Sequence, residues 1–286
     1  MTKQLPTRST IFTILFTAVL GTALTGTTSS ARAQSASTTA PAQQIQQGRT
    51  LMETVVTNPD SQKALRAHQL FVEAARQSQD TQKALAHYYA AYANYRLGTI
   101  IFQENESRSQ NQLEQAARQL KETLQIRPRL AEAHALLASV YGQLLQHVPE
   151  RGSELGPKSA RHMEQALNLA PDNPRVLLLK AISEFYTPEK WGGSKVKAHK
   201  RFRAATQAFE REAQPDSQTS RRANASLDPT WGHAEAYAWL GLASLKLDQP
   251  MSAKRAFKNA LEVNSEYSWV KQRLLPKLRK EQQSSS

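Results

Sequence analysis

The chain has 286 residues, 40% of them hydrophobic, which is enough apolar material for a packed core or a long repeat array. It contains no cysteine, which excludes disulfides, thiolate catalysis, zinc ribbons and iron–sulfur ligation. The formal net charge is +13, and the sparse glycine (11) and proline (13) beside abundant Ala, Leu and Gln favour helix over sheet.

Residues 1–33 have the three parts of a secretory signal peptide. Lys3 and Arg8 make the start positive, the run at 11–20 (IFTILFTAVL) is apolar, and the tripeptide at 31–33 (ARA) is a small-x-small cleavage motif. The apolar run is shorter than the ~20 residues that a membrane helix needs, so export is favoured over a short membrane anchor. We therefore expect a bacterial periplasmic or secreted protein with a cleaved signal peptide.

Three further segments flank the central part of the chain. Residues 34–44 (QSASTTAPAQQ) are small and polar and include a proline, which predicts a flexible leader. Apolar residues then recur at three- and four-residue spacings, which predicts a helical N-terminal extension over 45–83. At the other end, 268–286 predicts a capping helix with a basic outer side, followed by a disordered tail at 282–286.

Internal repetition is the strongest feature of the sequence. Four similar helical stretches each end on a small residue, and these residues are Ala91, Ala138, Ala181 and Gly241. The second helix of the last unit carries Ala253, Phe257 and Ala260. Small residues recur because antiparallel helices approach most closely where side chains are smallest, and a large residue fills the space between hairpins. The pattern divides the chain into units at 84–130, 131–173, 174–233 and 234–267.

The stretch 234–267 resembles a complete tetratricopeptide repeat (TPR). Leu240-Gly241, Ala253, Phe257 and Ala260 fall at the motif's positions, and the other three units resemble the motif with insertions. The string PEKWGG at 188–193 is similar to a connector of small exported bacterial TPR proteins. The resemblance implies an all-α solenoid of about four TPR-like hairpins with an N-terminal helical extension and a capping helix, and it implies no catalytic activity.

The Gly192-Gly193-Ser194 sequence admits two interpretations. It can form a tight turn in which Ser194 caps the following helix. It could instead cradle a phosphate, but no strand precedes it and no Gly-Lys-Ser/Thr follows. We favour the structural turn.

No recognised catalytic or metal-binding motif occurs. The sequence has no HExxH, no G-x-S-x-G, no Walker motif and no dinucleotide fingerprint. His87 and His134 occupy equivalent repeat positions that Leu177 and Tyr237 hold in the other units, so packing is the favoured role. We therefore expect no enzyme, no cofactor and no metal site. We also expect no nucleic-acid partner, because the positive residues are scattered among acidic ones.

The inner wall of such a solenoid is the predicted binding site for a protein or peptide partner. Aromatic and basic residues dominate binding energy in peptide grooves. The candidate groove residues are Tyr88, Tyr92, Tyr95, Arg96, Phe185, Tyr186 and Lys246. Some of these rings could instead pack between hairpins, and Trp231, at the end of the long 213–233 connector, is expected to pack on the fourth hairpin.

A different class of function is also open. With the three positive residues of 1–33 removed, the mature chain keeps a formal charge of +10. Such a surface could rest on anionic lipid or cell-wall glycan, as in a structural protein of the envelope. Salt separates the two hypotheses, since adsorption to a surface fades steeply with ionic strength.

Overall fold

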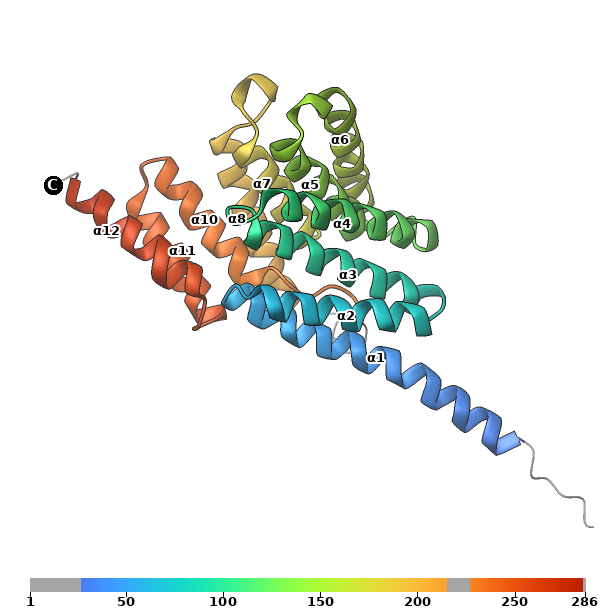
Figure 1. The fold of residues 1–286 in the computed structure, drawn as a ribbon. Coiled ribbons are helices and arrows are strands. Elements are labelled where there is room, and N and C mark those ends of the chain that lie inside the picture. Colours follow the sequence, from blue (N-terminus) through green and yellow to red (C-terminus); the bar gives the residue numbers. More distant parts are fainter. Residues whose placement is uncertain (1–26, 215–226, 285–286) are drawn as a thin grey trace, which may run out of the picture. The chain divides into compact units, whose positions relative to one another are not determined.

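The computed structural model describes residues 27–214 and 227–284, and this part of the chain is helical without any strand (Figure 1). The long helices are α1 (Thr27–Thr57), α2 (Ser61–Gln77), α3 (Asp80–Ile101), α4 (Glu106–Ile126), α5 (Ala131–His147), α6 (Gly152–Leu169), α7 (Pro174–Tyr186), α8 (Lys195–Ala213), α10 (His233–Lys246), α11 (Pro250–Val263) and α12 (Leu275–Ser284). Short turns of helix are η1 (Pro149–Arg151), η2 (Glu189–Trp191) and η3 (Val270–Leu274). The boundary between two compact units falls within α1, after Ala36, and the description below concerns the second unit.

Consecutive helices pair as hairpins, which confirms the predicted all-α solenoid-like architecture. The pairs are α3 with α4, α5 with α6, α7 with α8 and α10 with α11, and each hairpin packs on the next through contacts such as α4 with α5 and α8 with α10 (Figure 1). α7 contributes to both halves of the core: Val176 and Leu179 pack with the N-terminal helices, whereas Leu177 and Leu178 pack toward α10. None of the helices in the two described ranges is long and apolar enough to span a membrane.

The repeat positions are buried, and at Gly241 two helices meet closely. Ala91, Ala138 and Ala181 are at most 1% exposed. In the fourth hairpin, a Cβ added to Gly241 would lie 2.3 Å from the ring of Phe257, so α10 and α11 meet with no room for a methyl group. Ala253, Phe257 and Ala260 are fully buried beside this crossing.

Gly241→Ala is therefore expected to destabilise the protein by about 1–3 kcal/mol, because the methyl group overpacks the contact with Phe257. Gly142→Ala is the matched control, since Gly142 also lies within a helix but a Cβ there meets nothing within 4 Å. The control should be neutral or more stable by up to ~1 kcal/mol. Urea unfolding of both variants tests this, and equal stabilities would show that the crossing is not tight.

The turn at 187–194 has the structural role predicted for it. Gly192 has φ 86°, and a Cβ on Gly193 would lie 1.7 Å from the carbonyl oxygen of Thr187, so both positions require glycine. Ser194 caps α8, because its hydroxyl accepts a hydrogen bond from the backbone N–H of Lys197.

The structure corrects the two predictions of irregular chain that fall on described residues. The predicted leader at 34–44 is part of α1, which runs without a break through Pro41; its Ala and Gln residues favour helix, and the small polar composition concealed this. The predicted tail at 282–286 is helical as far as Ser284, the end of α12. Residues 1–26, with most of the predicted signal peptide, lie outside the described part.

Candidate functional site

The tyrosines of α3 lie in the core. Tyr88, Tyr92 and Tyr95 are 0%, 1% and 6% exposed, so they do not form the open groove wall that the sequence predicted. Burial raises the pKa of Tyr95 to about 12 and raises those of Tyr88 and Tyr92 further above the ordinary value. Of the two roles that the sequence left open for these rings, packing is the one seen.

Tyr88 and Tyr92 are covered by a non-helical stretch of the chain itself, residues 227–232, here called the inner segment. Trp231 stacks on Tyr92 with ring centroids 4.7 Å apart, and its indole N–H donates to the Tyr88 hydroxyl at 3.0 Å. The Tyr89 hydroxyl donates to the carbonyl oxygen of Asp228 at 3.0 Å. Trp231 therefore anchors the connector on the first hairpin. It also packs against the hydrophobic cluster of α7, α8, α10 and α11, which includes the fourth hairpin where the sequence predicted contact.

Two arginines hold other parts of the inner segment. Arg49 of α1 donates to the Thr230 hydroxyl at 2.7 Å, and Arg127 pairs with Asp228 at 3.2 Å. The segment thus lies along the same wall that a bound peptide would use, and its polar groups are met by side chains from three different places in the sequence.

Arg96 is also part of an internal link. Its guanidinium lies 2.9 Å from the Glu235 carboxylate of α10, and the two side chains are only 16% and 9% exposed. Burial alone would lower the pKa of Arg96, but the charge of Glu235 raises it above the ordinary value. This ion pair ties the first hairpin to the fourth, and together with the inner segment it closes the N-terminal part of the predicted groove.

The C-terminal part of the same wall carries a partly open aromatic cluster, here called the aromatic patch: Phe185, Tyr186, Trp239 and Trp269. Tyr186 is 61% exposed and lies edge-on to Trp239, with centroids 5.6 Å apart. Trp239 and Trp269 are half-buried, 4.9 Å apart. The indole N–H of Trp239 is buried and has no hydrogen-bond partner.

A basic side chain stands beside the aromatic patch. The ammonium group of Lys195 lies 3.9 Å from the ring centroid of Phe185 and contacts the Phe185 carbonyl oxygen. Lys246, at the end of α10, is exposed. Phe185, Tyr186 and Lys246 were predicted groove residues, whereas Trp239 and Trp269 were missed. The sequence does contain a signal for Trp239. The first helix of the last unit has this tryptophan at the position where the other units have Tyr89, Leu136 and Leu179.

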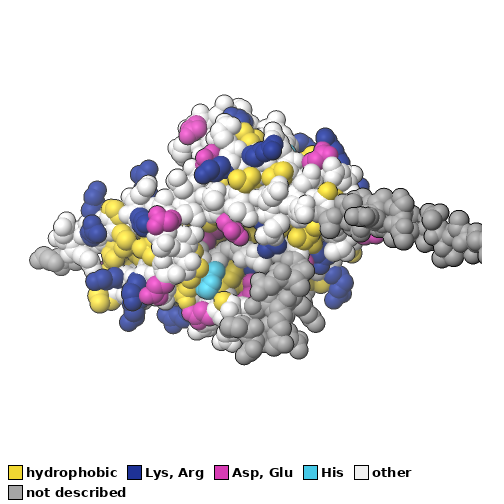
Figure 2. All heavy atoms as spheres, turned by 90° about the horizontal axis from the view of Figure 1, so that it is seen from below, with side chains coloured by type: hydrophobic (Ala, Val, Ile, Leu, Met, Phe, Trp, Pro, Cys, Tyr) yellow, Lys and Arg dark blue, Asp and Glu magenta, His cyan; other side chains and the backbone are white. Residues whose placement is uncertain are grey.

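The charged side chains are mixed on the surface. On the face drawn in Figure 2, Lys and Arg side chains lie among Asp and Glu without gathering into one large basic area. Several are paired along helices, such as Arg151 and Lys158 with Glu154. This face therefore gives little support to adsorption on an anionic layer.

Histidines are used for packing, and the described residues contain no group of three or more His, Asp or Glu that could hold a metal ion. His134 faces His162 with their Nδ1 atoms 2.9 Å apart, and its Nε2 lies 3.0 Å from the Pro128 carbonyl oxygen. Burial, and secondarily the charge of His134, lower the pKa of His162 to about 4.

The low pKa of His162 predicts acid destabilisation. In the unfolded chain this histidine titrates near 6.5, so the folded state binds fewer protons between pH 6.5 and 4. Its contribution to stability is fully present above pH 6.5 and is lost as the pH falls toward 4. The urea midpoint should fall over this range, and His162→Gln should reduce the fall. A variant with the wild-type pH dependence would contradict this assignment.

Comparisons with known proteins show a similar fold in a solved structure. No protein-family model matches the chain, and no curated protein matches it. A solved structure, the HusA haemophore from Porphyromonas gingivalis, is similar with a TM-score of 0.58 and 25% sequence identity. The similarity covers 73% of this chain and 94% of that protein, so the helical array described here shares its fold with nearly the whole of a haemophore.

Proposed function

We propose that the mature chain is an exported, non-catalytic helical-repeat adaptor that binds a peptide or protein segment on the aromatic patch. The observation that carries the proposal is the partly open Tyr186–Trp239–Trp269 surface on the inner wall of the array. Aromatic anchors of this kind supply most of the energy in peptide recognition.

The inner segment supports this choice of ligand. It is a non-helical piece of polypeptide that lies on the neighbouring part of the wall through a stacked tryptophan and a hydrogen bond to its backbone carbonyl. The first of these contacts, ring stacking, is available to a partner at the partly open rings of the aromatic patch. The array thus already holds one non-helical segment of its own chain by aromatic contact.

A second candidate ligand is a flat aromatic molecule such as haem. The fold shared with a haemophore favours it, and so does the cluster of rings with Lys195 nearby, since an ammonium group can pair with a carboxylate of a porphyrin. The patch supplies stacking surfaces for such a ligand in the same place where a peptide would bind. Both candidates therefore use one site and can be compared in one assay.

The binding experiment uses the mature chain, residues 34–286, and three probes: an array of fluorescent extended peptides, haemin, and vesicles with anionic lipid. Tryptophan fluorescence and polarisation measure binding at low and moderate ionic strength. A peptide that binds at both supports the adaptor, haemin binding supports the second candidate, and vesicle binding that fades with salt supports the envelope role instead.

Two double variants locate the site. Tyr186→Ala with Lys246→Ala removes an exposed ring and a cation from the proposed site, and Lys190→Ala with Trp191→Ala removes the same groups from η2, where Trp191 is 74% exposed. We expect the first variant to bind its probe at least about tenfold more weakly, and the second to bind like wild type. Failure of every peptide and of haemin to bind the wild type would overturn the proposal.

Export is tested separately by N-terminal sequencing of the protein after expression in a Gram-negative host. The proposal expects the chain outside the cytoplasm to begin at Gln34. A chain that retains residues 1–33 and sediments with membranes would contradict cleavage and favour the membrane anchor.

A further inference from the structure

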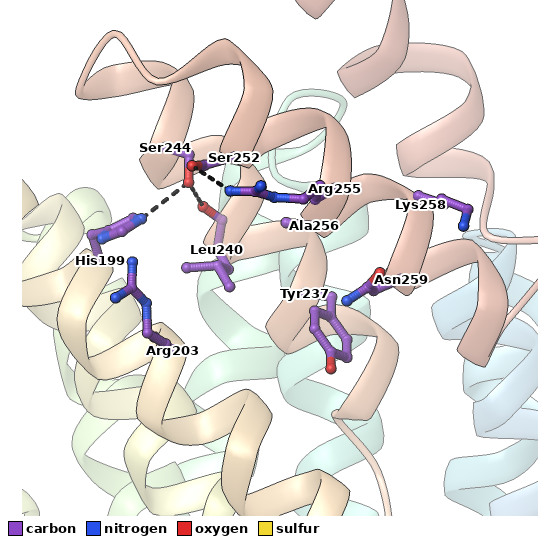
Figure 3. Close-up of a pocket in the computed structure, with 10 residues that line it drawn as sticks. All are labelled: His199, Arg203, Tyr237, Leu240, Ser244, Ser252, Arg255, Ala256, Lys258 and Asn259. Atoms are coloured by element: carbon purple, nitrogen blue, oxygen red, sulfur yellow. Dashed lines mark hydrogen bonds between the residues drawn. The ribbon is translucent and has the colours of Figure 1, made fainter.

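A cavity lies between α8, α10 and α11, and its lining residues are not those of the aromatic patch. Its volume is ≈ 580 Å³, within the range of small-molecule sites. Figure 3 shows ten residues that line it, from all three helices. Arg203 comes from α8 and Arg255 from α11, and Leu240, Tyr237 and Ala256 supply apolar surface.

The two arginines face this cavity without acidic partners. In Figure 3 their guanidinium groups lie on the same side of the pocket as Ser244 and His199. No ion pair within the described ranges joins either arginine to a carboxylate, and the hydrogen bond from Arg255 to the Ser252 hydroxyl, at 3.4 Å, is a long one. Both arginines are exposed at the edge of the hollow, so a bound oxyanion can pair with their guanidinium groups.

Ser244 and His199, which line the pocket on the same side as the arginines, are hydrogen-bonded to each other. The Ser244 hydroxyl donates to the Leu240 carbonyl oxygen at 2.9 Å, so its only proton is used. His199, 8% exposed, must therefore donate from Nε2 to the Ser244 oxygen, 3.0 Å away, and its Nδ1 is left to take up a proton.

Acidic charge stands at the other end of the pocket. The Tyr237 hydroxyl donates to the carboxylate of Glu210, which lies outside the lining residues, and Figure 3 shows Tyr237 and Asn259 apart from His199 and the arginines. Lys258 points away from the two arginines and pairs with Glu262 at 3.2 Å. An anionic head group would therefore sit near the arginines, with an apolar body toward Leu240 and Tyr237.

We infer that the pocket between α8, α10 and α11 binds a small organic anion, a carboxylate or phosphate group on an apolar body, with Arg203 and Arg255 holding the oxyanion. The site is separate from the aromatic patch and does not depend on its occupant. Leu240 and Ala256 distinguish it from a site for a bare inorganic ion, because they offer the ligand apolar contact.

The test titrates the mature protein calorimetrically with phenyl phosphate, phthalate and inorganic phosphate at fixed ionic strength. Arg203→Gln with Arg255→Gln is the test variant. Lys200→Gln with Lys254→Gln is the control, because these exposed residues lie on the same two helices, carry the same charge and do not line the pocket. Circular dichroism verifies that both variants are folded.

We expect the wild type and the control to bind phenyl phosphate or phthalate more tightly than inorganic phosphate, and the test variant to bind at least about tenfold more weakly. The better of the two organic probes identifies the head group. Three results would overturn the inference. The wild type could bind neither phenyl phosphate nor phthalate, the test variant could bind them as tightly as the wild type, or the control could lose as much affinity as the test variant.

A second readout follows from His199. In the free protein, burial and the nearby charge of Arg203 lower the pKa of this imidazole. Arg203 and Arg255 are the cations on its side of the pocket, Lys258 lies apart from it, and Glu210 with Tyr237 lies at the far end. NMR titration should show the pKa of His199 rising when the organic anion binds. If the pKa of His199 stayed unchanged when the organic anion saturated the protein, the anion would bind at another place.

Discussion

Glu212→Gln is expected to lower the free energy of unfolding by about 3–5 kcal/mol. Arg175, in the second position of α7, has a side chain only 2% exposed, and Glu212 meets it with two hydrogen bonds of 2.9 and 2.5 Å. Burial alone would lower the pKa of Arg175, but Glu212 raises it above the ordinary value, so the charge stays. Glutamine leaves that charge buried without compensation. Urea unfolding of the mature chain measures the loss.

Two further variants make this prediction specific. Glu73→Gln removes one member of an exposed pair with Arg76, at 3.4 Å, and should change stability by less than about 1 kcal/mol. Arg175→Met combined with Glu212→Leu removes both charges and should cost much less than Glu212→Gln alone. If Glu212→Gln cost no more than Glu73→Gln, the pair would not be buried as described.

The second large effect is expected for Trp231→Ala, which should lower the free energy of unfolding by about 3 kcal/mol. The substitution removes the ring stacked on Tyr92 and the N–H donated to Tyr88, and it releases the anchor of the inner segment. Because the tryptophan is half-buried, the loss lies at the lower end of the range for core aromatic residues. Trp231→Phe keeps a ring but loses the donor, and should cost about 1–2 kcal/mol.

The exposed Trp191 provides the control. Trp191→Ala should stay within about 0.5 kcal/mol of wild type, since its side chain is 74% exposed. Chemical unfolding gives the stabilities, and quenching of tyrosine fluorescence by acrylamide reports whether Tyr88 and Tyr92 become accessible. Equal stability of Trp231→Ala and Trp191→Ala would mean that the inner segment is not held by its tryptophan.

The sequence predicted the local part of this fold well. The small and large positions of the last unit, such as Gly241 and Phe257, describe a contact between two adjacent helices, and spacing alone determines which residues meet. The glycines at 192 and 193 and the cap at Ser194 are also local, because each depends on backbone geometry within a few residues.

The predicted site was less accurate because its contacts join distant parts of the chain. Arg96 pairs with Glu235, 139 positions away, and Trp231 meets Tyr88 across 143 positions. Nothing in the spacing of α3 shows that a later connector returns to cover it. The aromatic patch was found only in part for the same reason: Tyr186 belongs to one hairpin, Trp239 to the next and Trp269 to the chain beyond.

These distant contacts also change which variants test function. Tyr92→Ala with Arg96→Ala, the natural choice from the sequence, would remove a buried ring and leave Glu235 without its partner. Loss of binding in that variant would report on stability. Tyr186 and Lys246 are exposed, so their replacement changes the proposed contact surface and leaves the core intact.

Hydrogen exchange of the mature chain, with and without the peptide or haemin that binds it, tests the central claim most directly. Ligand binding to the aromatic patch predicts slower exchange at the end of α7, around residues 182–186, and along α10 at 239–246. Exchange in the inner segment, 227–232, should stay unchanged because its anchor remains in place. Slowed exchange confined to α3, together with faster exchange in 227–232, would mean that the partner displaces the inner segment and would contradict the account.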